Sequence, residues 1–375
     1  MLFGYVEENS YTIKNDEDDP ILSADYYFGT NEDGARHTGW LQYTDALTDK
    51  DDDYYWFYFN TSNGKKVKNQ EKTINGKKYS FDNDGIMNFK WTKASGATRA
   101  EKWYGALEDG SLAKNKWIWN KPYEQVSIKA NQDDYEDETP RWFRTDASGN
   151  LVKGKTKKVN SKWYVFDEDG VMKTGLVLLK NDKGEPSPSV SGASFDKAFD
   201  MDEVDKDALY AVVTNATDKV AAGQAIHYFS EDEEKDGSMK TGTMKIELAD
   251  DEYTFCFTKT TGAAKNGYDS SNKKVYNSGI LEKAGDDKYK VVEDRTTSNK
   301  YLVGSTGSVV KTVSKYKDAN DKYYLYLKDG SKAWVIYSTL SEDDAKAVIN
   351  AGDDAAKLAK AKTLGLNEEG KGSTN

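Results

Sequence analysis

The 375-residue sequence holds one cysteine, five prolines and two histidines. A single cysteine cannot form an internal disulfide, and the position of Cys256 between Phe255 and Phe257 is typical of a small core residue. The scarcity of proline excludes a proline-rich linker. No apolar run approaches the roughly 20 residues that cross a bilayer, so no membrane span is expected. The first five residues lack the basic and long apolar regions of a signal peptide, so we expect that an export signal is not in this chain.

Positive charge is also in deficit, because 53 Lys and Arg face 64 Asp and Glu and the net charge is −11. A chain this acidic repels phosphate backbones and anionic lipid at long range, which excludes general nucleic-acid binding. His37 and His227 are the only histidines available as proton shuttles near neutral pH. Neither lies in a zinc-binding HExxH motif. We therefore expect no catalytic residue, no cofactor and no enzyme activity within this chain.

Two acidic turns, residues 82–85 and 167–170, invite a calcium interpretation. A calcium loop of the EF-hand type needs a bidentate Glu at its twelfth position. Lys93 and Leu178 occupy those positions. The sequence therefore predicts hairpin turns here and no metal site.

Aromatic residues are abundant, at 13% of the chain with 25 Tyr, although the whole hydrophobic set reaches only 37%. This composition is too poor in aliphatic residues for one thick core. It favours a thin structure in which rings join neighbouring elements.

Many of these rings belong to an internal repeat in which an aromatic pair is followed, after five residues, by glycine. The strict copies run from Tyr27-Phe28 to Gly34, Phe57-Tyr58 to Gly64, Trp103-Tyr104 to Gly110, Trp142-Phe143 to Gly149, Trp163-Tyr164 to Gly170 and Tyr323-Tyr324 to Gly330. Looser copies end at Gly85, Gly237, Gly262 and Gly307. Residues 64–91 align without a gap on residues 149–176, with 12 of 28 positions identical. A period of this kind is the signature of a repeat architecture.

Each copy has the local pattern of a β-hairpin. Residues 162–166 alternate polar and aromatic side chains like a half-buried strand, and the Asp-Glu-Asp-Gly that follows is a turn sequence. One such hairpin is marginal by itself and gains a second layer only by stacking on its neighbours. We therefore predict an all-β fold, a repetitive β-hairpin solenoid with irregular inserts and a short α-helical C-terminal tail.

The expected organisation has four parts. Residues 1–26 form an N-terminal lead-in, 27–179 the regular repeats, 180–340 divergent β-repeats with inserts, and 341–375 the helical tail. Segments 41–54, 120–140 and 180–205 are expected to be loops, and 210–214, 225–229, 245–248 and 253–258 to be strands. In the tail, Ser341 opens a capping-box pattern, two short helices break near Gly352, and residues 367–375 are expected to fray.

The repeat resembles the cell-wall-binding repeats of Gram-positive bacteria, which include choline-binding, glucan-binding and clostridial-toxin-type repeats. The shared pattern is an aromatic pair, a turn ending in Asp-Gly, Met or another apolar residue, and then Thr-Gly-Trp. It is represented here by residues 163–175, 236–242 and 38–40, and residues 73–79 are similar to the toxin and glucan-binding versions. The resemblance implies a cell-surface protein, extracellular or attached to the cell wall.

The resemblance also implies ligand sites between neighbouring hairpins, where rings surround a quaternary ammonium by cation–π attraction. The family Trp is matched at Trp40 and Trp91, whereas Leu176 and Thr243 replace it in two other repeats. Choline cages are therefore limited to the regions of Trp40 with Phe57 and Tyr58, and of Trp91 with Trp103 and Tyr104. A glycan platform tolerates such losses better. The candidate ligand-binding residues are Trp40, Phe57, Tyr58, Tyr79, Trp91, Trp103, Tyr104, Trp117, Trp163 and Tyr164.

The leading functional hypothesis is a non-catalytic carbohydrate-binding module that holds a cell-wall polymer or extracellular glucan. The alternative for any one ring is a purely structural role, in which it joins one repeat to the next. Met87 and Met172 are likewise expected to be core filler. A second hypothesis is a structural or adhesive protein whose inserts 120–140, 180–205 and 268–298 contact a host or bacterial surface protein. A third is the targeting part of a larger secreted hydrolase or toxin.

Overall fold

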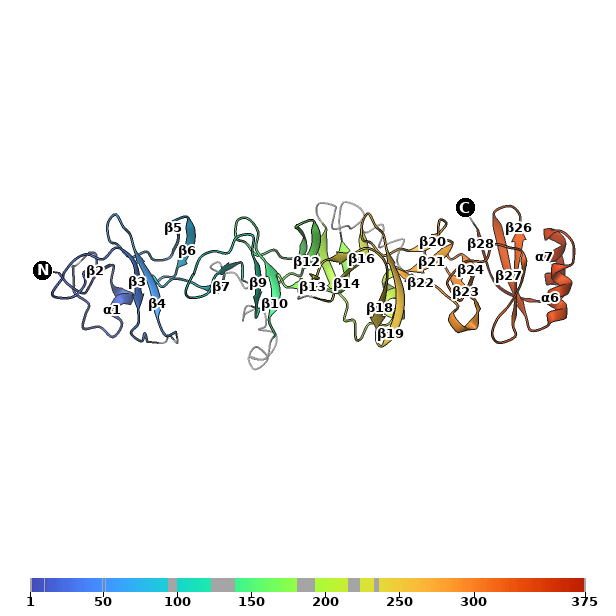
Figure 1. Ribbon diagram of the computed structural model, residues 1–375, viewed down its shortest axis with the longest axis horizontal. Helices are drawn as coiled ribbons and strands as arrows, with labels where there is room; N and C mark the ends of the chain where they lie inside the picture. The colour runs from blue at the N-terminus through green and yellow to red at the C-terminus, as the bar shows by residue number, and fades with distance from the viewer. Residues whose placement is uncertain are drawn as a thin grey trace. The chain divides into compact units, whose positions relative to one another are not determined.

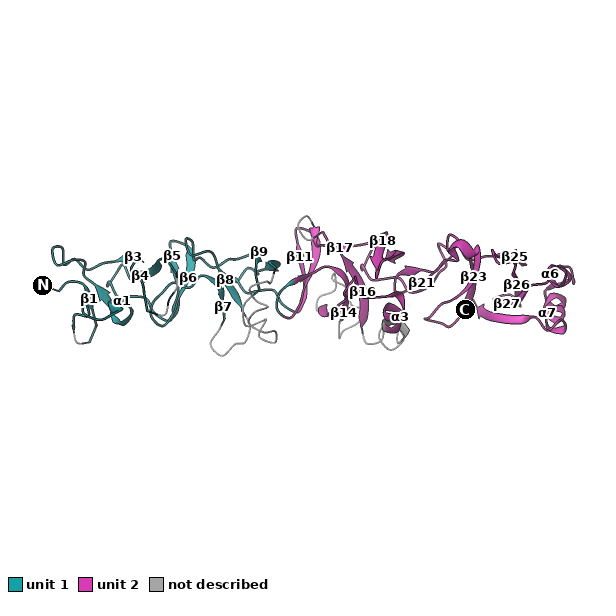
Figure 2. Cartoon of the chain, turned by 90° about the horizontal axis from the view of Figure 1, so that it is seen from below, with its two compact units in different colours: residues 1–153, 169–171 teal, residues 154–168, 172–375 magenta. Residues whose placement is uncertain are grey.

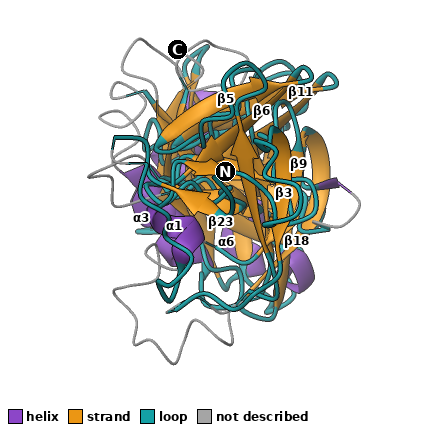
Figure 3. Ribbon diagram, turned by 90° about the vertical axis from the view of Figure 1, so that its left-hand side faces the viewer, coloured by secondary structure: helices purple, strands orange, loops and turns teal. Residues whose placement is uncertain are grey.

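The computed structural model describes residues 2–9, 11–48, 50, 52–93, 100–122, 139–180, 193–214, 223–232 and 236–373. Strands predominate and the helices are few and short (Figure 3), so the predicted all-β class is confirmed. The chain divides into two compact units, residues 1–153 with 169–171 and residues 154–168 with 172–375 (Figure 2). The four-part organisation expected from the sequence stays a prediction.

The first unit is a succession of two-stranded antiparallel sheets (Figure 1). Their strands are β1 (Tyr5–Val6) with β2 (Tyr26–Tyr27), β3 (Gly39–Tyr43) with β4 (Tyr55–Phe59), β5 (Gln70–Ile74) with β6 (Lys77–Phe81), β7 (Lys90–Thr92) with β8 (Lys102–Tyr104), and β9 (Trp117–Asn120) with β10 (Arg141–Arg144). The short helix α1 (Pro20–Ser23) precedes β2. Repeated hairpins are thus what the aromatic–glycine frame encodes.

The hairpin turns have the backbone geometry that the sequence indicates. Asn75 and Gly76, between β5 and β6, both take positive φ (49° and 80°), as a two-residue hairpin turn that matches strand twist requires. In the acidic turn after β6, Asp82 Oδ1 accepts hydrogen bonds from the backbone N–H groups of Asp84 (3.0 Å) and Ile86 (2.8 Å). The first carboxylate of this turn is therefore occupied in closing the turn itself.

A recurrent backbone hydrogen bond joins six of the repeats to an earlier part of the chain. The N–H of the second residue after a frame glycine donates to a carbonyl oxygen of a preceding strand or turn. The pairs are Lys66 to Asp25, Met87 to Trp56, Leu112 to Lys78, Leu151 to Glu101, Ala264 to Ile226 and Val309 to Lys273, at 2.7–2.9 Å. We call this bond the rung. It gives the repeats in both units one common stacking register.

The frame glycine also lies against an apolar side chain of an earlier repeat. A Cβ built on Gly149 would lie 2.7 Å from Leu112 Cγ and Cδ2, and one on Gly170 would lie 2.7 Å from Leu151 Cδ2. Gly110 approaches Met87, and Gly262 approaches Met239, in the same way. Close contact between repeats therefore requires the absence of a side chain at this position.

The second unit has wider antiparallel sheets. Its seven-stranded sheet has the order β13-β12-β11-β15-β14-β16-β17, its five-stranded sheet β18-β19-β22-β21-β20, and its four-stranded sheet β25-β26-β27-β28, while β23 and β24 pair alone. The strand bounds are β11 (Lys155–Val159), β12 (Lys162–Phe166), β13 (Met172–Lys173), β14 (Gly175–Lys180), β15 (Ser194–Ala198), β16 (Gln224–Phe229), β17 (Met239–Lys240), β18 (Gly242–Leu248), β19 (Asp251–Phe257), β20 (Gly267–Asp269), β21 (Lys274–Asn277), β22 (Ile280–Leu281), β23 (Tyr289–Glu293), β24 (Lys300–Gly304), β25 (Ser314–Lys317), β26 (Tyr323–Asp329), β27 (Ala333–Thr339) and β28 (Asn367–Ser373). The strands expected around 225–229, 245–248 and 253–258 are β16, β18 and β19.

Helix α3 (Lys206–Thr214) replaces the strand expected over residues 210–214. Its residues Leu209 and Tyr210 are buried in the core cluster that also holds Phe255 and Phe257. The β-propensity of residues 210–214 was outweighed here by the burial of Leu209 and Tyr210, which the helix makes possible. The expectation of a strand was wrong for this segment.

The tail contains the two predicted helices, α6 (Glu342–Ile349) and α7 (Asp354–Thr363), on either side of Gly352. Ser341 caps α6 by accepting from the N–H of Asp344 at 3.1 Å, as its sequence pattern indicates. The fraying expected at residues 367–375 was wrong over 367–373, because β28 pairs antiparallel with β27 along this stretch. Residues 367–373 form a strand because their backbone pairs with β27. The sequence of polar side chains gives no sign of that pairing.

The three segments expected to contact a protein partner differ in the structure. Most of 120–140 and the first part of 180–205 lie outside the described residues, and 194–198 forms β15. Segment 268–298 is ordered as β20 to β23 with the 3₁₀ turn η2 (Gly285–Asp287). The loop expected over 41–54 was wrong for residues 41–43, which belong to β3, and the loop expected over 180–205 was wrong for residues 194–198 of β15, because both stretches pair with a neighbouring strand.

Candidate functional site

Strand alternation divides the rings of β4 between two faces. Tyr55, Phe57 and Phe59 are buried in a cluster with Ile21. The intervening Trp56 and Tyr58 lie on the other face, where they belong to the cluster built around Phe81. In the antiparallel register, Trp40 of β3 stands directly opposite Tyr58. Successive side chains of a strand point to opposite faces, so this split follows from sequence parity alone.

Rings of two consecutive repeats meet around Trp40. Its ring centroid lies 6.1 Å from that of Trp56 and 5.1 Å from that of Tyr58, at interplanar angles of 87° and 70°. The next hairpin contributes Tyr79, at 4.8 Å and 72°. These edge-to-face contacts leave the rings as walls at steep angles to each other, not as one flat platform.

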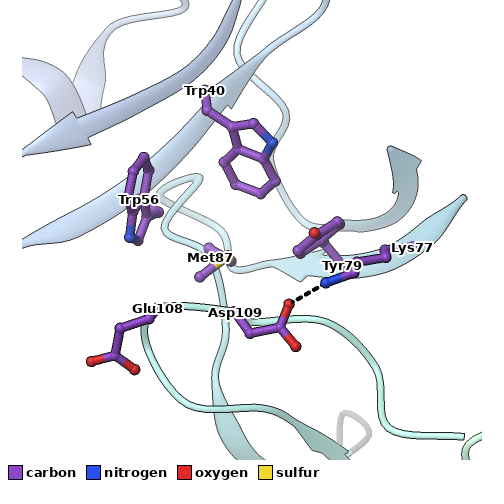
Figure 4. A pocket seen from close by; sticks show the side chains of 7 residues that line it. All are labelled: Trp40, Trp56, Lys77, Tyr79, Met87, Glu108 and Asp109. Atoms are coloured by element: carbon purple, nitrogen blue, oxygen red, sulfur yellow. Dashed lines mark hydrogen bonds and ion pairs between the residues drawn. The ribbon is translucent and has the colours of Figure 1, made fainter. Parts of the chain in front are cut away.

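A pocket of about 310 Å³ opens between these walls. Figure 4 shows Trp40, Trp56 and Tyr79 around it, with Met87 between them and the side chains of Glu108 and Asp109 below. Lys77, Glu108 and Asp109 complete the lining. We call this the aromatic pocket. A volume at the small end of the usual ligand-pocket range fits a head group or a single sugar ring.

The rung fixes Met87 in the wall of the aromatic pocket. The Met87 N–H donates to Trp56 O at 2.8 Å, and the side chain is buried. Gly110 lies so close that a Cβ there would be 2.3 Å from Met87 Sδ and Cε. The thioether is therefore held between the two repeats, and the Met87 side chain belongs to the same cluster as Tyr79 and Phe81.

The rim of the aromatic pocket carries net negative charge from Glu108 and Asp109 against Lys77. Lys77 Nζ lies 2.8 Å from Asp109 Oδ1, and this hydrogen bond is the main cause that lowers the pKa of Asp109 and raises the pKa of Lys77. Asp109 Oδ2 also accepts from Ser111 Oγ at 2.8 Å. Asp109 is consequently ionised at neutral pH.

Trp56 adds a polar feature to the wall. Its indole Nε1 is buried and has no hydrogen-bond partner among the described residues. A buried donor without an acceptor is destabilising by about 1–3 kcal/mol. A ligand oxygen or water that reached this N–H would remove that penalty.

The candidate residues near this pocket are only partly brought together. Trp40 and Tyr79 line the pocket and Tyr58 contacts Trp40 from behind, but Phe57 is fully buried on the opposite face of β4. Tyr104 is also buried, and its hydroxyl donates to Glu71 Oε1 at 2.6 Å. These two rings belong to the interior.

Trp91 and Trp103 form a second aromatic cluster. The ring centroid of Trp91 lies 4.7 Å from those of both Trp103 and Phe143. The Trp91 Nε1–H donates to Lys121 O at 2.8 Å. The rings of this cluster pack against one another and against buried Ile118.

The remaining candidates lie elsewhere in the two units. Trp117 on β9 stacks edge-to-face with Trp142 at 6.1 Å, and the Arg144 guanidinium lies 5.5 Å from the Trp117 ring centroid. Burial lowers the pKa of Arg144. Trp163 and Tyr164 are half-buried on β12 in the second unit, where Lys158 Nζ lies 5.7 Å from the Trp163 ring centroid. Neither group joins the aromatic pocket within the first unit.

Sequence reasoning missed Trp56, Lys77, Glu108 and Asp109, and took Met87 as core filler. The signal for Trp56 was present, because residues two apart on a strand share a face and Trp56 is two residues from Tyr58. Lys77 begins β6, whereas Glu108 and Asp109 come from the turn of a later repeat, which only the stacking of the repeats brings to the pocket.

The two histidines are occupied in structural roles. His227 is fully buried, and burial lowers its pKa to about 4, so it is neutral at physiological pH. His37 Nε2 lies 3.1 Å from Trp40 O, beside the aromatic pocket and not in its lining.

No family model matches the chain. No curated protein matches it either. Among solved structures, choline binding protein F of Streptococcus pneumoniae, in the presence of a peptidoglycan analogue, is 18% identical with a TM-score of 0.42, over 83% of this chain and 88% of that one. CbpJ of Streptococcus pneumoniae TIGR4 is 15% identical with a TM-score of 0.43, over 85% and 98%. The modular autolysin LytC of Streptococcus pneumoniae, with a synthetic peptidoglycan ligand, is 15% identical with a TM-score of 0.28, over 86% and 66%.

These similar structures include choline-binding proteins, which belong to the cell-wall-binding repeat family that the motif resembles. Among the described residues, no helix has the length and apolar character needed to span a bilayer. At such identities and TM-scores the likeness says nothing about the pocket, whose chemistry follows from its own residues.

Proposed function

We propose that this chain is a non-catalytic, extracellular binding module that holds a cell-wall polymer in the aromatic pocket. The observation that carries the proposal is the convergence of Trp40, Trp56 and Tyr79 from two hairpins on one cavity with an acidic rim. The resemblance of the repeat to cell-wall-binding repeats supplies the class of polymer. The repeats then act as a scaffold that presents the pocket at the cell surface.

The charge and ring geometry favour a cationic group on that polymer, such as a quaternary ammonium. A cation gains about 0.5–2 kcal/mol from an aromatic face, most when it is desolvated. The steeply angled rings offer more than one face to a compact group, and the carboxylates of Glu108 and Asp109 supply the opposite charge. A neutral sugar would gain nothing from that charge.

A glucan is the second candidate ligand, and a specific observation favours it. Trp56 Nε1 is an unpaired buried donor in the wall, and a sugar or glycosidic oxygen could accept from it. The rim carboxylates could in turn accept from sugar hydroxyls. One ring-sized pocket would bind either ligand weakly, so retention on a polymer depends on many contacts acting together.

Binding to purified Gram-positive cell walls and to insoluble glucan tests the proposal, with calorimetric titration by choline and by a gluco-oligosaccharide. Trp40→Leu should weaken the titrated ligand about three- to thirty-fold, because it removes one ring contact of about 0.7–2 kcal/mol. Trp119→Leu is the matched control, since Trp119 is an exposed Trp of the same unit outside the pocket. The control should bind as the unchanged chain does.

Glu108→Gln separates the two ligands without removing a ring. It should weaken choline several-fold and leave a neutral oligosaccharide within about two-fold, because only the cation interacts with the charge. If the unchanged chain is retained neither on walls nor on glucan, the module proposal fails. A structural or adhesive protein, or the targeting part of a larger secreted enzyme that acts on another polymer, then remains.

A further inference from the structure

A second cavity lies in the second unit and has the opposite charge. It measures about 220 Å³, opens to solvent, and is lined by rings, small apolar residues, one serine and lysines. Its lining is Tyr268, Lys273, Tyr301, Val309, Val310, Lys311, Tyr326, Lys328, Ser331, Lys332, Ala333 and Trp334. Four of these residues are lysines and none is Asp or Glu. We call this the lysine pocket.

The wall of the lysine pocket is a continuous series of rings from different strands. Tyr268 of β20 stacks on Tyr301 of β24 with centroids 4.7 Å apart and planes 22° apart. Tyr301 contacts Trp334 of β27 at 5.2 Å, and Trp334 stacks on Tyr326 of β26 at 6.2 Å and 29°. These rings are more nearly parallel than those of the aromatic pocket. All four rings line the lysine pocket, and the half-buried Tyr268 is the most accessible of them.

The ring series is held rigidly. The Trp334 Nε1–H donates to Lys300 O at 2.8 Å. Tyr301, Tyr326 and Trp334 are buried in the core cluster around Ile336, while Tyr268 is half-buried. Burial raises the pKa of Tyr301 and of Tyr326 to about 12, so both keep the hydroxyl proton at neutral pH. A ligand would therefore meet a preformed surface.

The fold places the lysines around these rings through backbone contacts. Lys328 stands directly opposite Trp334 in the β26–β27 register. The rung from Val309 N–H to Lys273 O, 2.9 Å long, brings the turn that bears Lys273 beside the segment that bears Lys311. Lys332 follows in the turn between β26 and β27. Three separate segments thus contribute ammonium groups to one cavity.

Three of the four lysines of the pocket are not paired with a carboxylate of the described residues. Within the described part of the chain, Lys273, Lys311 and Lys328 form no ion pair with a carboxylate, whereas many lysines elsewhere do, such as Lys265 with Asp269 at 2.6 Å. The whole chain has a net charge of −11. A local group of unpaired lysines beside aromatic rings has the opposite sign to that net charge and attracts anions.

We propose that the lysine pocket binds an anionic sugar unit, one that carries a carboxylate or a phosphate group. The ring faces of Tyr268 and Trp334 receive the sugar, and Lys273, Lys311 and Lys328 receive the acidic group. The volume equals about seven water molecules at roughly 30 Å³ each, which is room for one sugar ring and no oligosaccharide in full. The site is separate from the aromatic pocket and its ligand has the opposite charge.

Titration of the full chain with single sugars tests this proposal. Glucuronic acid and glucose 6-phosphate are the two anionic probes, glucose is the neutral probe, and inorganic phosphate is the probe without a ring. The chain carries Trp40→Leu in all arms, so that binding at the aromatic pocket does not contribute and failure there stays distinguishable from failure here. Ligand-observed NMR suits the expected millimolar affinities.

The expected result is that at least one anionic sugar binds ten-fold or more tightly than glucose and also more tightly than inorganic phosphate. Which of the two probes binds identifies the acidic group as carboxylate or phosphate. The double change Lys273→Gln with Lys328→Gln should weaken that sugar at least five-fold, because each ammonium at an exposed site contributes up to about five-fold. Lys290→Gln, an exposed lysine of β23 outside the pocket, is the charge-matched control and should change binding less than two-fold.

Three results would overturn the proposal. Equal binding of glucose and the acidic sugars removes the role of the lysines. Equal binding of inorganic phosphate and glucose 6-phosphate removes the role of the rings and leaves a simple anion site. Equal weakening by Lys290→Gln and by the double change shows that general charge, and not this pocket, attracts the ligand.

Discussion

Replacement of Gly149 by alanine tests whether the frame glycine exists for its backbone angle or for the contact between repeats. Gly149 has a φ of +87°, and a Cβ there would lie 2.7 Å from Leu112 Cγ. The matched control is Gly76→Ala, because Gly76 has a φ of +80° and no other atom within 4 Å of its added Cβ. The two changes share the backbone strain, and only one of them adds a clash.

The expected magnitudes follow from these two contributions. An alanine in the left-handed region loses about 1–2 kcal/mol relative to glycine. Overpacking of a close contact adds about 1–3 kcal/mol, and Leu112 is buried, so it cannot move aside freely. Gly149→Ala should therefore lower the free energy of unfolding by about 2–5 kcal/mol, and Gly76→Ala by about 1–2 kcal/mol. In a chain that already carries Leu112→Ala, the loss in free energy of unfolding caused by Gly149→Ala should be only about 1–2 kcal/mol, because the clash is gone.

Urea unfolding of the full chain, followed by far-UV circular dichroism and by tryptophan fluorescence, measures these differences. The double-mutant cycle between Gly149 and Leu112 isolates the contact from the backbone strain. If Gly149→Ala and Gly76→Ala destabilise equally, or if Leu112→Ala does not relieve the effect, the glycine serves only its backbone angle. The proposed reason for the repeat frame is then wrong.

Three further outcomes are expected. Lys66 is buried and burial lowers its pKa to about 7 from 10.5, so between pH 7 and 10 the unfolded chain binds a proton that the folded chain has released. The free energy of unfolding should rise with pH in this window by up to about 1.4 kcal/mol per unit, and Lys66→Met should flatten the slope of urea midpoints measured at pH 7 and 9; an unchanged slope would contradict the assignment. Glu282→Ala should lower the thermal unfolding midpoint through a loss of about 2–4 kcal/mol, because it leaves buried Asn277 Nδ2, now 2.8 Å from Glu282 Oε1, and the Tyr210 hydroxyl without this acceptor; an unshifted midpoint would refute this network. Phe57→Leu should destabilise by about 1–2 kcal/mol in urea and leave wall binding unchanged, since Phe57 lies in the core, and weakened binding at full stability would return it to the site.

The hairpins were predictable because their determinants are local. An aromatic pair followed by Asp and Gly encodes a strand and its turn within a dozen residues, and the structure has them at Lys77–Phe81 and Lys162–Phe166. The Ser341 cap of α6 is local in the same sense. Elements whose state depends on distant partners were not predictable: α3 is helical where its face meets Phe255, and β28 is a strand because β27 offers it an open edge.

The candidate site was half predictable for the same reason. Trp40 and Tyr79 carry a motif and were identified. Strand alternation places Trp56 on the same face of β4 as Tyr58 and Phe57 on the other face, a signal that the sequence contains but that the motif does not mark. The acidic rim comes from a later turn that the rung places over the rings. The lysine pocket carried no motif signal, because its lysines are scattered over three segments that only the fold assembles.

The rung joins two peptide groups, so its formation does not depend on which side chains flank it. The same bond joins Met87 to Trp56 across a shorter stretch of chain and Leu151 to Glu101 across a longer one. The longer stretch includes residues 123–138. Such an array can accept insertions, lose a tryptophan or exchange one surface charge for another, because the backbone hydrogen bonds between its repeats keep the same stacking register. An acidic cavity and a basic one can thus arise on a single chain, each adjusted without re-engineering the other.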